Sequence, residues 1–96
     1  MKISFRATAQ QDLRWYEYYH AHRISGGRKR AEQRLRSALQ LLKANPYAGI
    51  SVGEANARSF PVLRTAFVLH YLIIDDTIQI LRVWDSRADP EKLYMR

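Results

Sequence analysis

Residues 65–84 read TAFVLHYLIIDDTIQILRVW, and this stretch decides the fold. Two runs rich in β-branched and aromatic residues, 65–74 and 77–84, are separated only by Asp75 and Asp76. Such runs are typical of β-strands, and a two-residue connection is typical of a tight hairpin. We therefore predict a β-hairpin that turns at Asp75-Asp76, although the turn lacks the glycine that marks the strongest hairpin signals.

Further strands are predicted on both sides of this hairpin along the chain. Residues 57–64 (ARSFPVLR) indicate a strand just before it. Residues 2–6 (KISFR) alternate apolar and polar side chains, which fits a short strand that begins the sheet. Residues 46–57 contain two glycines and show no periodicity, so we predict a loop there, and residues 89–96 (DPEKLYMR) indicate a short turn or helix.

A first helix is predicted directly after the first strand. Thr8 and Gln11 have the form of a capping box, in which each side chain serves an otherwise unpaired backbone amide. Two stripes at helical spacing follow, and they predict a helix that is buried over much of its circumference. The stripes consist of Ala9, Leu13, Tyr16 and His20, and of Trp15, Tyr19 and His22.

A second helix is predicted from about Arg28 to Ala44. Ser25-Gly26-Gly27 ends the first helix and reverses the chain, and Asn45-Pro46 stops the second. The apolar stripe of this helix consists of Ala31, Leu35, Ala38, Leu39 and Leu42. Its remaining face carries Arg28, Lys29, Arg30, Arg34, Arg36 and Lys43. Two helices joined by a short glycine-rich link should lie antiparallel as a hairpin.

The element order is therefore β-α-α-β-β-β, which we expect to form one domain over residues 1–96. Helices followed by a run of strands indicate the α+β class. We predict that the N-terminal strand and the helical hairpin pack on an antiparallel sheet. With 96 residues, of which 47% are hydrophobic, the chain has room for one modest core.

Several classes of site lack support in the sequence. The chain has no cysteine, so disulfides and thiolate metal sites are excluded. His20 and His22 stand at i and i+2, which point to different sides of a helix, so no metal is expected. His70 fits a buried or half-buried, hydrogen-bonded imidazole better than a ligand. No phosphate-binding loop, hydrolase triad, signal segment or membrane span is indicated, so we expect a cytoplasmic protein with no cofactor or small-molecule ligand.

The positive charge lies in one half of the chain. Residues 1–45 contain ten Lys and Arg against three Asp and Glu, whereas residues 46–96 contain six of each kind, and the net charge is +7. This excess indicates an acidic partner, either nucleic acid or an acidic protein. The basic face of the second helix is either an ordinary solvated face or a docking surface for that partner. Its lack of interleaved aromatic residues weakens direct binding of single-stranded nucleic acid.

Arginines gather near the end of the predicted hairpin. Arg64 precedes one strand, Arg82 lies in the next and Arg87 follows it, so pairing about Asp75-Asp76 would place Arg64 and Arg87 at the same end. A cluster of guanidinium groups there could bind phosphate or carboxylate. In the structural alternative, Arg82 and Arg87 pair with Asp85 and Asp89 and only hold the C-terminal segment.

The ordered combination of these motifs resembles the RelE/ParE superfamily of bacterial toxins over almost the whole chain. The motifs are A-x-x-D-L-x-x-Y-x-x-Y at residues 9–19, NPYAG at 45–49, and FPVLR, FVLHYLI and DDTIQILRVWDSRADP in the strands. The resemblance implies the toxin of a type II toxin–antitoxin pair. It also implies a cognate, acidic antitoxin whose C-terminal segment wraps the toxin, and a complex that binds operator DNA through the antitoxin.

The RelE-like branch of the superfamily implies a ribosome-dependent mRNA endonuclease. Its members use lysines and arginines on the sheet together with a C-terminal tyrosine. The candidates for such a site are Arg82, Arg87 and Tyr94. The expected lysines fall near Phe60 and Val62, and an expected arginine falls near Val68. Apolar side chains cannot donate to a phosphate, so this activity is the alternative and not the main prediction.

The ParE-like branch resembles the chain better, in the ILRVW ending and in the long helical hairpin. It implies inhibition of DNA gyrase by protein–protein contact, without chemistry of its own. Asp85 stands where many relatives carry histidine, so no general base is assigned. The candidate contacts to target or antitoxin are Arg28, Lys29, Arg30, Arg34, Arg36, Arg64, Arg82, Trp84 and Arg87.

Overall fold

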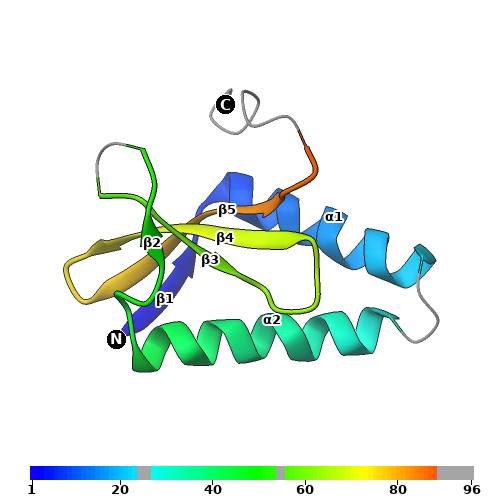
Figure 1. The fold of residues 1–96 in the computed structure, drawn as a ribbon, viewed down its shortest axis with the longest axis horizontal. Coiled ribbons are helices and arrows are strands. Elements are labelled where there is room, and N and C mark those ends of the chain that lie inside the picture. The colour runs from blue at the N-terminus through cyan, green and yellow to red at the C-terminus, as the bar shows by residue number, and fades with distance from the viewer. Residues whose placement is uncertain (24–26, 54–55, 89–96) are drawn as a thin grey trace.

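The computed structural model describes residues 1–23, 27–53 and 56–88 (Figure 1). Its elements are β1 (Lys2–Phe5), α1 (Ala7–Arg23), α2 (Gly27–Ala44), β2 (Ile50–Ser51), β3 (Arg58–Pro61), β4 (Phe67–Ile74) and β5 (Thr77–Asp85). The predicted α+β class and the order of the predicted elements are confirmed. The short strand β2 is an addition, because it lies in the segment predicted as a loop. The turn or helix predicted for 89–96 lies outside the described residues.

The five strands form one sheet in the order β1-β5-β4-β3-β2. β4 and β5 are the predicted hairpin, and Ile74 pairs with Thr77 across the two-residue turn. Asp75 takes a positive φ of 53°, which aspartate tolerates better than most residues. The sheet is mixed rather than wholly antiparallel, because β1 pairs with β5 in parallel. The chain crosses through both helices to the far edge of the sheet and then returns strand by strand to β1.

β5 is longer than its neighbour β1, and α1 takes over as its partner where β1 ends. β1 pairs with residues 77–80 only. Beyond that point, the Thr8 hydroxyl donates to the Leu81 carbonyl (3.1 Å), and the Asp12 carboxylate accepts from the Val83 amide (3.0 Å). The predicted capping box is therefore wrong, since Thr8 lies inside α1 and its hydroxyl serves the edge of the sheet.

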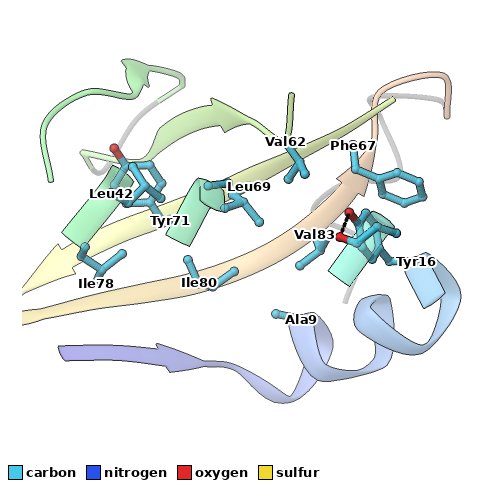
Figure 2. Packing of buried hydrophobic residues seen from close by; sticks show 12 residues of the cluster. Ala9, Tyr16, Leu42, Val62, Phe67, Leu69, Tyr71, Ile78, Ile80 and Val83 are labelled. Atoms are coloured by element: carbon cyan, nitrogen blue, oxygen red, sulfur yellow. Dashed lines mark hydrogen bonds between the residues drawn. The ribbon is translucent and has the colours of Figure 1, made fainter. Parts of the chain in front are cut away.

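The core lies between the helices and one face of the sheet (Figure 2). Tyr16 of α1 is fully buried, and its hydroxyl donates to the Ala31 carbonyl of α2 at 2.7 Å, which joins the two helices of the predicted hairpin. Burial raises the pKa of Tyr16 to about 12, partly offset by the charge of Arg34. The predicted apolar stripe of α2 is confirmed: Ala31, Ala38 and Leu42 are buried, and Leu35 and Leu39 are half-buried.

The predicted burial of α1 on two stripes is only half right. Tyr16 and His20 are buried, but Trp15 of the second stripe is 45% exposed and His22 is exposed. Tyr19 is half-buried. The reason is that the sheet and α2 cover one side of α1, so the aromatic residues on its other side face solvent.

The segment after α2 is held against the sheet by Tyr71. The Tyr71 hydroxyl donates to the Pro46 carbonyl (2.8 Å) and accepts from the Gly49 amide (2.9 Å). Gly49 has no room for a side chain, because an added Cβ would lie 2.5 Å from the Tyr71 hydroxyl and 2.9 Å from the Ser59 carbonyl oxygen. Close backbone packing here seats the short β2 beside β3.

Candidate functional site

A groove of about 550 Å³ runs between α2 and the turn that joins β3 to β4. We call it the basic groove. It is lined by Arg30, Gln33, Arg34, Ser37, Ala38, Leu41, Phe60, Pro61, Leu63 and Arg64. Leu63 is 62% exposed and Leu41 is also exposed, so the groove offers apolar side chains to solvent among three guanidinium groups. Three of the arginines predicted as contact residues are thus brought together by the fold.

Helical spacing and one hydrogen bond position these groups. Arg30, Arg34 and Leu41 stand at i, i+4 and i+11, so they share one side of α2. Arg34 donates from Nη1 to the Arg64 carbonyl at 3.1 Å, which ties the helix to the turn. Arg64 itself takes a φ of 64°, a strained conformation for a residue with a side chain. The contact from Arg34 helps to hold this turn in place.

The arginines of the basic groove have no carboxylate partner among the residues that the structure describes. By contrast, Arg28 on the same helix pairs with Glu17 (3.6 Å) and Glu32 (3.4 Å). Lys29 and Arg36, also predicted as contacts, are exposed but do not line the groove. The groove therefore combines apolar contact area with positive charge that the described chain does not neutralise, which suits an acidic and partly apolar ligand.

Arg82 has a different position from the one expected of a binding residue. It is only 9% exposed, and its guanidinium donates to both oxygens of Asp12, from Nε at 2.7 Å and from Nη2 at 3.0 Å. It also lies 5.0 Å from the centre of the Trp84 ring. The structural alternative named Asp85 and Asp89 as the carboxylates that pair with Arg82 and Arg87, but Arg82 pairs with Asp12. Asp89 lies outside the described residues. One sequence signal pointed to this pair: Asp12 stands at helical spacing from Ala9 and Tyr16, so its carboxylate had to find a partner near the core.

Arg87 pairs with a nearby carboxylate, as the structural alternative predicts. Its guanidinium donates to both oxygens of Asp85, at 2.9 Å and 2.7 Å, and lies over the ring of Tyr19 at 4.4 Å, where it also donates to the Tyr19 hydroxyl. These hydrogen bonds hold the pKa of Asp85 below its usual value. A carboxylate so engaged is a poor general base.

Arg64 and Arg87 do lie at the same end of the sheet, as predicted. The Ser86 amide donates to the Ala66 carbonyl (2.8 Å), so the segment after β5 runs beside the β3–β4 turn. Their side chains serve different elements, however: Arg87 contacts Tyr19 of α1, and Arg64 lines the basic groove beside α2. The expected single cluster of guanidinium groups is not formed by these two residues.

The positions at which the nuclease alternative expects further lysines and an arginine carry apolar residues. Val62 is fully buried in the core, Phe60 lines the basic groove, and Val68 is half-buried in β4. Tyr94 lies outside the described residues. His70 is buried as predicted, but its Nδ1 has no hydrogen-bond partner, and burial, together with the charge of Arg82, lowers its pKa.

Within the described residues, no group of three or more His, Cys, Asp or Glu side chains is placed to hold a metal ion. No helix in that part of the chain is long and apolar enough to cross a membrane.

The arrangement of elements occurs in a solved structure described as "Chromosomal ParDE TA system from P. aeruginosa". The two chains superpose with a TM-score of 0.65 at 23% identity, over 86% of this chain and 92% of the other. At this identity the comparison shows that the two chains share a fold.

A comparison with models of protein families identifies the family. The model described as "ParE toxin of type II toxin-antitoxin system, parDE" matches residues 3–90, and the chain belongs to this family. No protein with a curated description matches the sequence.

Proposed function

We propose that this toxin inhibits DNA gyrase by protein–protein contact in the cytoplasm and that a cognate antitoxin neutralises it. The observation that carries the proposal is the match to the ParE family over residues 3–90. The described geometry is compatible with it, because Arg82 is engaged by Asp12 and Arg87 by Asp85. Neither guanidinium is poised to stabilise a reacting phosphate, so endonuclease activity remains the second candidate. The proposed inhibition of gyrase requires no cofactor. In this proposal the toxin–antitoxin complex binds operator DNA through the antitoxin.

The basic groove is the proposed docking site for the antitoxin. A flexible segment needs a concave surface that receives alternate side chains, and the basic groove provides one with Leu41, Phe60 and Leu63 in its lining. Arg30 and Arg64 lie on its two sides and can each bind a carboxylate through paired N–H donors. We therefore expect the antitoxin segment to be acidic and amphipathic, and its affinity to fall as salt rises.

Two double variants with equal loss of charge test this site. Arg30→Ala with Arg64→Ala removes two cations from the groove, and Lys29→Ala with Arg36→Ala removes two exposed cations outside it. We expect calorimetric titration to show at least tenfold weaker antitoxin binding for the first pair and less than about threefold for the second. Equal losses for both pairs would show that only net charge matters and would reject the groove as the site.

The activity itself is tested with purified gyrase and relaxed plasmid. The toxin should block supercoiling, and an equimolar amount of antitoxin should restore it. Unchanged supercoiling at toxin concentrations well above that of gyrase would refute the proposed target.

A further inference from the structure

An exposed row of aromatic rings follows the outer side of α1. Trp15, Tyr18 and His22 stand at i, i+3 and i+7, and we call them the aromatic ridge. Trp15 is 45% and Tyr18 is 56% exposed, and His22 is exposed as well. None of the three lines the basic groove. Large aromatic side chains that remain exposed as a contiguous row are unusual on a small domain and mark contact surfaces.

The rings of the aromatic ridge are already ordered against each other. Trp15 stacks on Tyr18 with centroids 5.9 Å apart, and Tyr18 stacks on His22 at 4.1 Å. Behind them, Tyr19 meets Trp15 edge-on at 5.9 Å and carries Arg23 over its ring at 5.2 Å. Rigid tryptophan and tyrosine side chains lose little conformational entropy on binding, and with arginine they dominate protein-binding hot spots.

The shape of the ridge indicates what kind of partner fits it. The ridge lies along one side of a single helix, and a helix can present such anchors to a groove on another molecule. At one end of the ridge, Trp15 also borders a hollow of about 560 Å³ beside β5. A flexible segment, by contrast, needs a concave receiver such as the basic groove. The partner of the ridge is therefore a folded protein that supplies the apolar groove itself.

The charges beside the ridge indicate which charges the partner should carry around its groove. Arg14 and Arg23 are exposed on α1, and no carboxylate among the described residues pairs with either of them. Of the two acidic residues of α1, Asp12 pairs with Arg82 at 2.7 Å and Glu17 pairs with Arg28 at 3.6 Å. A second copy of this chain would bring the same cations to both sides of the contact and repel. Acidic groups on the partner would complement them.

We propose that the aromatic ridge inserts into an apolar groove, rimmed by carboxylates, on a folded partner protein. The inference rests on the proposed function, under which this partner is DNA gyrase. Antitoxin and target then contact different surfaces of the toxin: the antitoxin segment lies in the basic groove, and the target receives the outer side of α1.

Removal of one exposed ring tests the proposal against a matched control. Tyr18→Ala deletes the central ring of the ridge, and Tyr47→Ala deletes a tyrosine that is 67% exposed in the segment after α2. Both variants should melt at temperatures close to that of the unsubstituted toxin, because neither side chain is buried. We expect Tyr18→Ala to raise the concentration for half-maximal inhibition of supercoiling at least tenfold and Tyr47→Ala less than threefold. Both should bind antitoxin as before.

The sign of the partner's charge is tested at the same position. Tyr18→Lys and Tyr18→Glu remove the ring equally and place opposite charges against the proposed acidic rim. We expect Tyr18→Lys to inhibit gyrase at lower concentration than Tyr18→Glu, and the reverse order would overturn the acidic partner.

Three other outcomes would also overturn the proposal, each in a recognisable way. Full inhibition by Tyr18→Ala would show that the ridge is not the target surface. A parallel loss of antitoxin affinity would assign the ridge to the antitoxin instead. No inhibition by the unsubstituted toxin would refute the proposed function, and with it the assignment of gyrase to the ridge.

Discussion

Replacement of Asp12 by alanine should destabilise the protein by about 3–5 kcal/mol, the usual cost of removing one partner of a buried ion pair. The Asp12 carboxylate accepts three hydrogen bonds, two from Arg82 at 2.7 and 3.0 Å and one from the Val83 amide at 3.0 Å. Alanine would remove the carboxylate that binds a guanidinium only 9% exposed to solvent. It would also leave a backbone amide at the edge of β5 without its acceptor.

This loss is large compared with the total stability of a small domain, which is about 5–15 kcal/mol. The matched control is Glu17→Ala, which removes a carboxylate from the same helix. Glu17 pairs with Arg28 at 3.6 Å on the surface, and both side chains are well exposed. Exposed ion pairs contribute about 0–1 kcal/mol, so this variant should unfold close to the unsubstituted protein.

Urea unfolding followed by circular dichroism at pH 7 measures both variants. A double-mutant cycle with Arg82→Ala should show a coupling energy of at least about 2 kcal/mol, because each single variant removes both hydrogen bonds between the two side chains. A loss below about 1 kcal/mol for Asp12→Ala, or additive effects in the cycle, would refute this account of Arg82.

Three further predictions concern other sites. Gly49→Ala should cost about 1–3 kcal/mol in urea unfolding, because the new Cβ meets the Tyr71 hydroxyl at 2.5 Å; an unchanged midpoint would show that the loop adjusts freely. Burial lowers the pKa of His70 from 6.5, so as pH falls the unfolded chain binds a proton on His70 before the folded protein does. The folded protein therefore keeps its full stability above pH 6.5 and loses stability as pH falls through the folded pKa of His70. His70→Gln should therefore flatten the loss of stability between about pH 7.5 and 5, and an unchanged slope would contradict this. Arg64→Ala should weaken antitoxin binding while inhibition of supercoiling and the far-UV spectrum stay unchanged; an equal loss of inhibition would show that target and antitoxin share the basic groove.

The local parts of the fold could be predicted because they depend on neighbouring residues. The β4–β5 hairpin follows from two strand-like runs and a two-residue link at Asp75-Asp76. The limits of α2 follow from Gly27 and Pro46 and from one clear apolar stripe. Hydrophobic periodicity and the residues that end helices can be recognised within short stretches of sequence.

The parts that were missed depend on contacts between distant segments. β2 has only two residues and exists because β3 pairs with it. Asp12 and Arg82 stand 70 residues apart, whereas the predicted carboxylate partners, Asp85 and Asp89, are close to Arg82 in the sequence. The exposure of Trp15 depends on how far the sheet and α2 extend around α1, which periodicity does not reveal.

The candidate site likewise combines residues that could be placed from the sequence with residues that only the folded chain brings together. Arg30 and Arg34 could be placed on one side of α2 from their spacing alone. Arg64 and Leu63 join them because the β3–β4 turn packs against α2, and this juxtaposition is a property of the folded chain. Of the apolar residues that line the basic groove, Ala38 and Leu41 belong to α2, whereas Phe60, Pro61 and Leu63 come from β3 and the turn after it.

The most direct test of the central claim is a supercoiling assay with purified gyrase and increasing toxin, run beside a translating extract in which mRNA is mapped for cuts. The proposed function predicts loss of supercoiling, restored by antitoxin, while the mRNA stays intact. Cut mRNA together with unaffected gyrase would contradict it. That result would mean that Arg87 and Tyr94 form a nuclease site although the expected lysines are replaced by Phe60 and Val62.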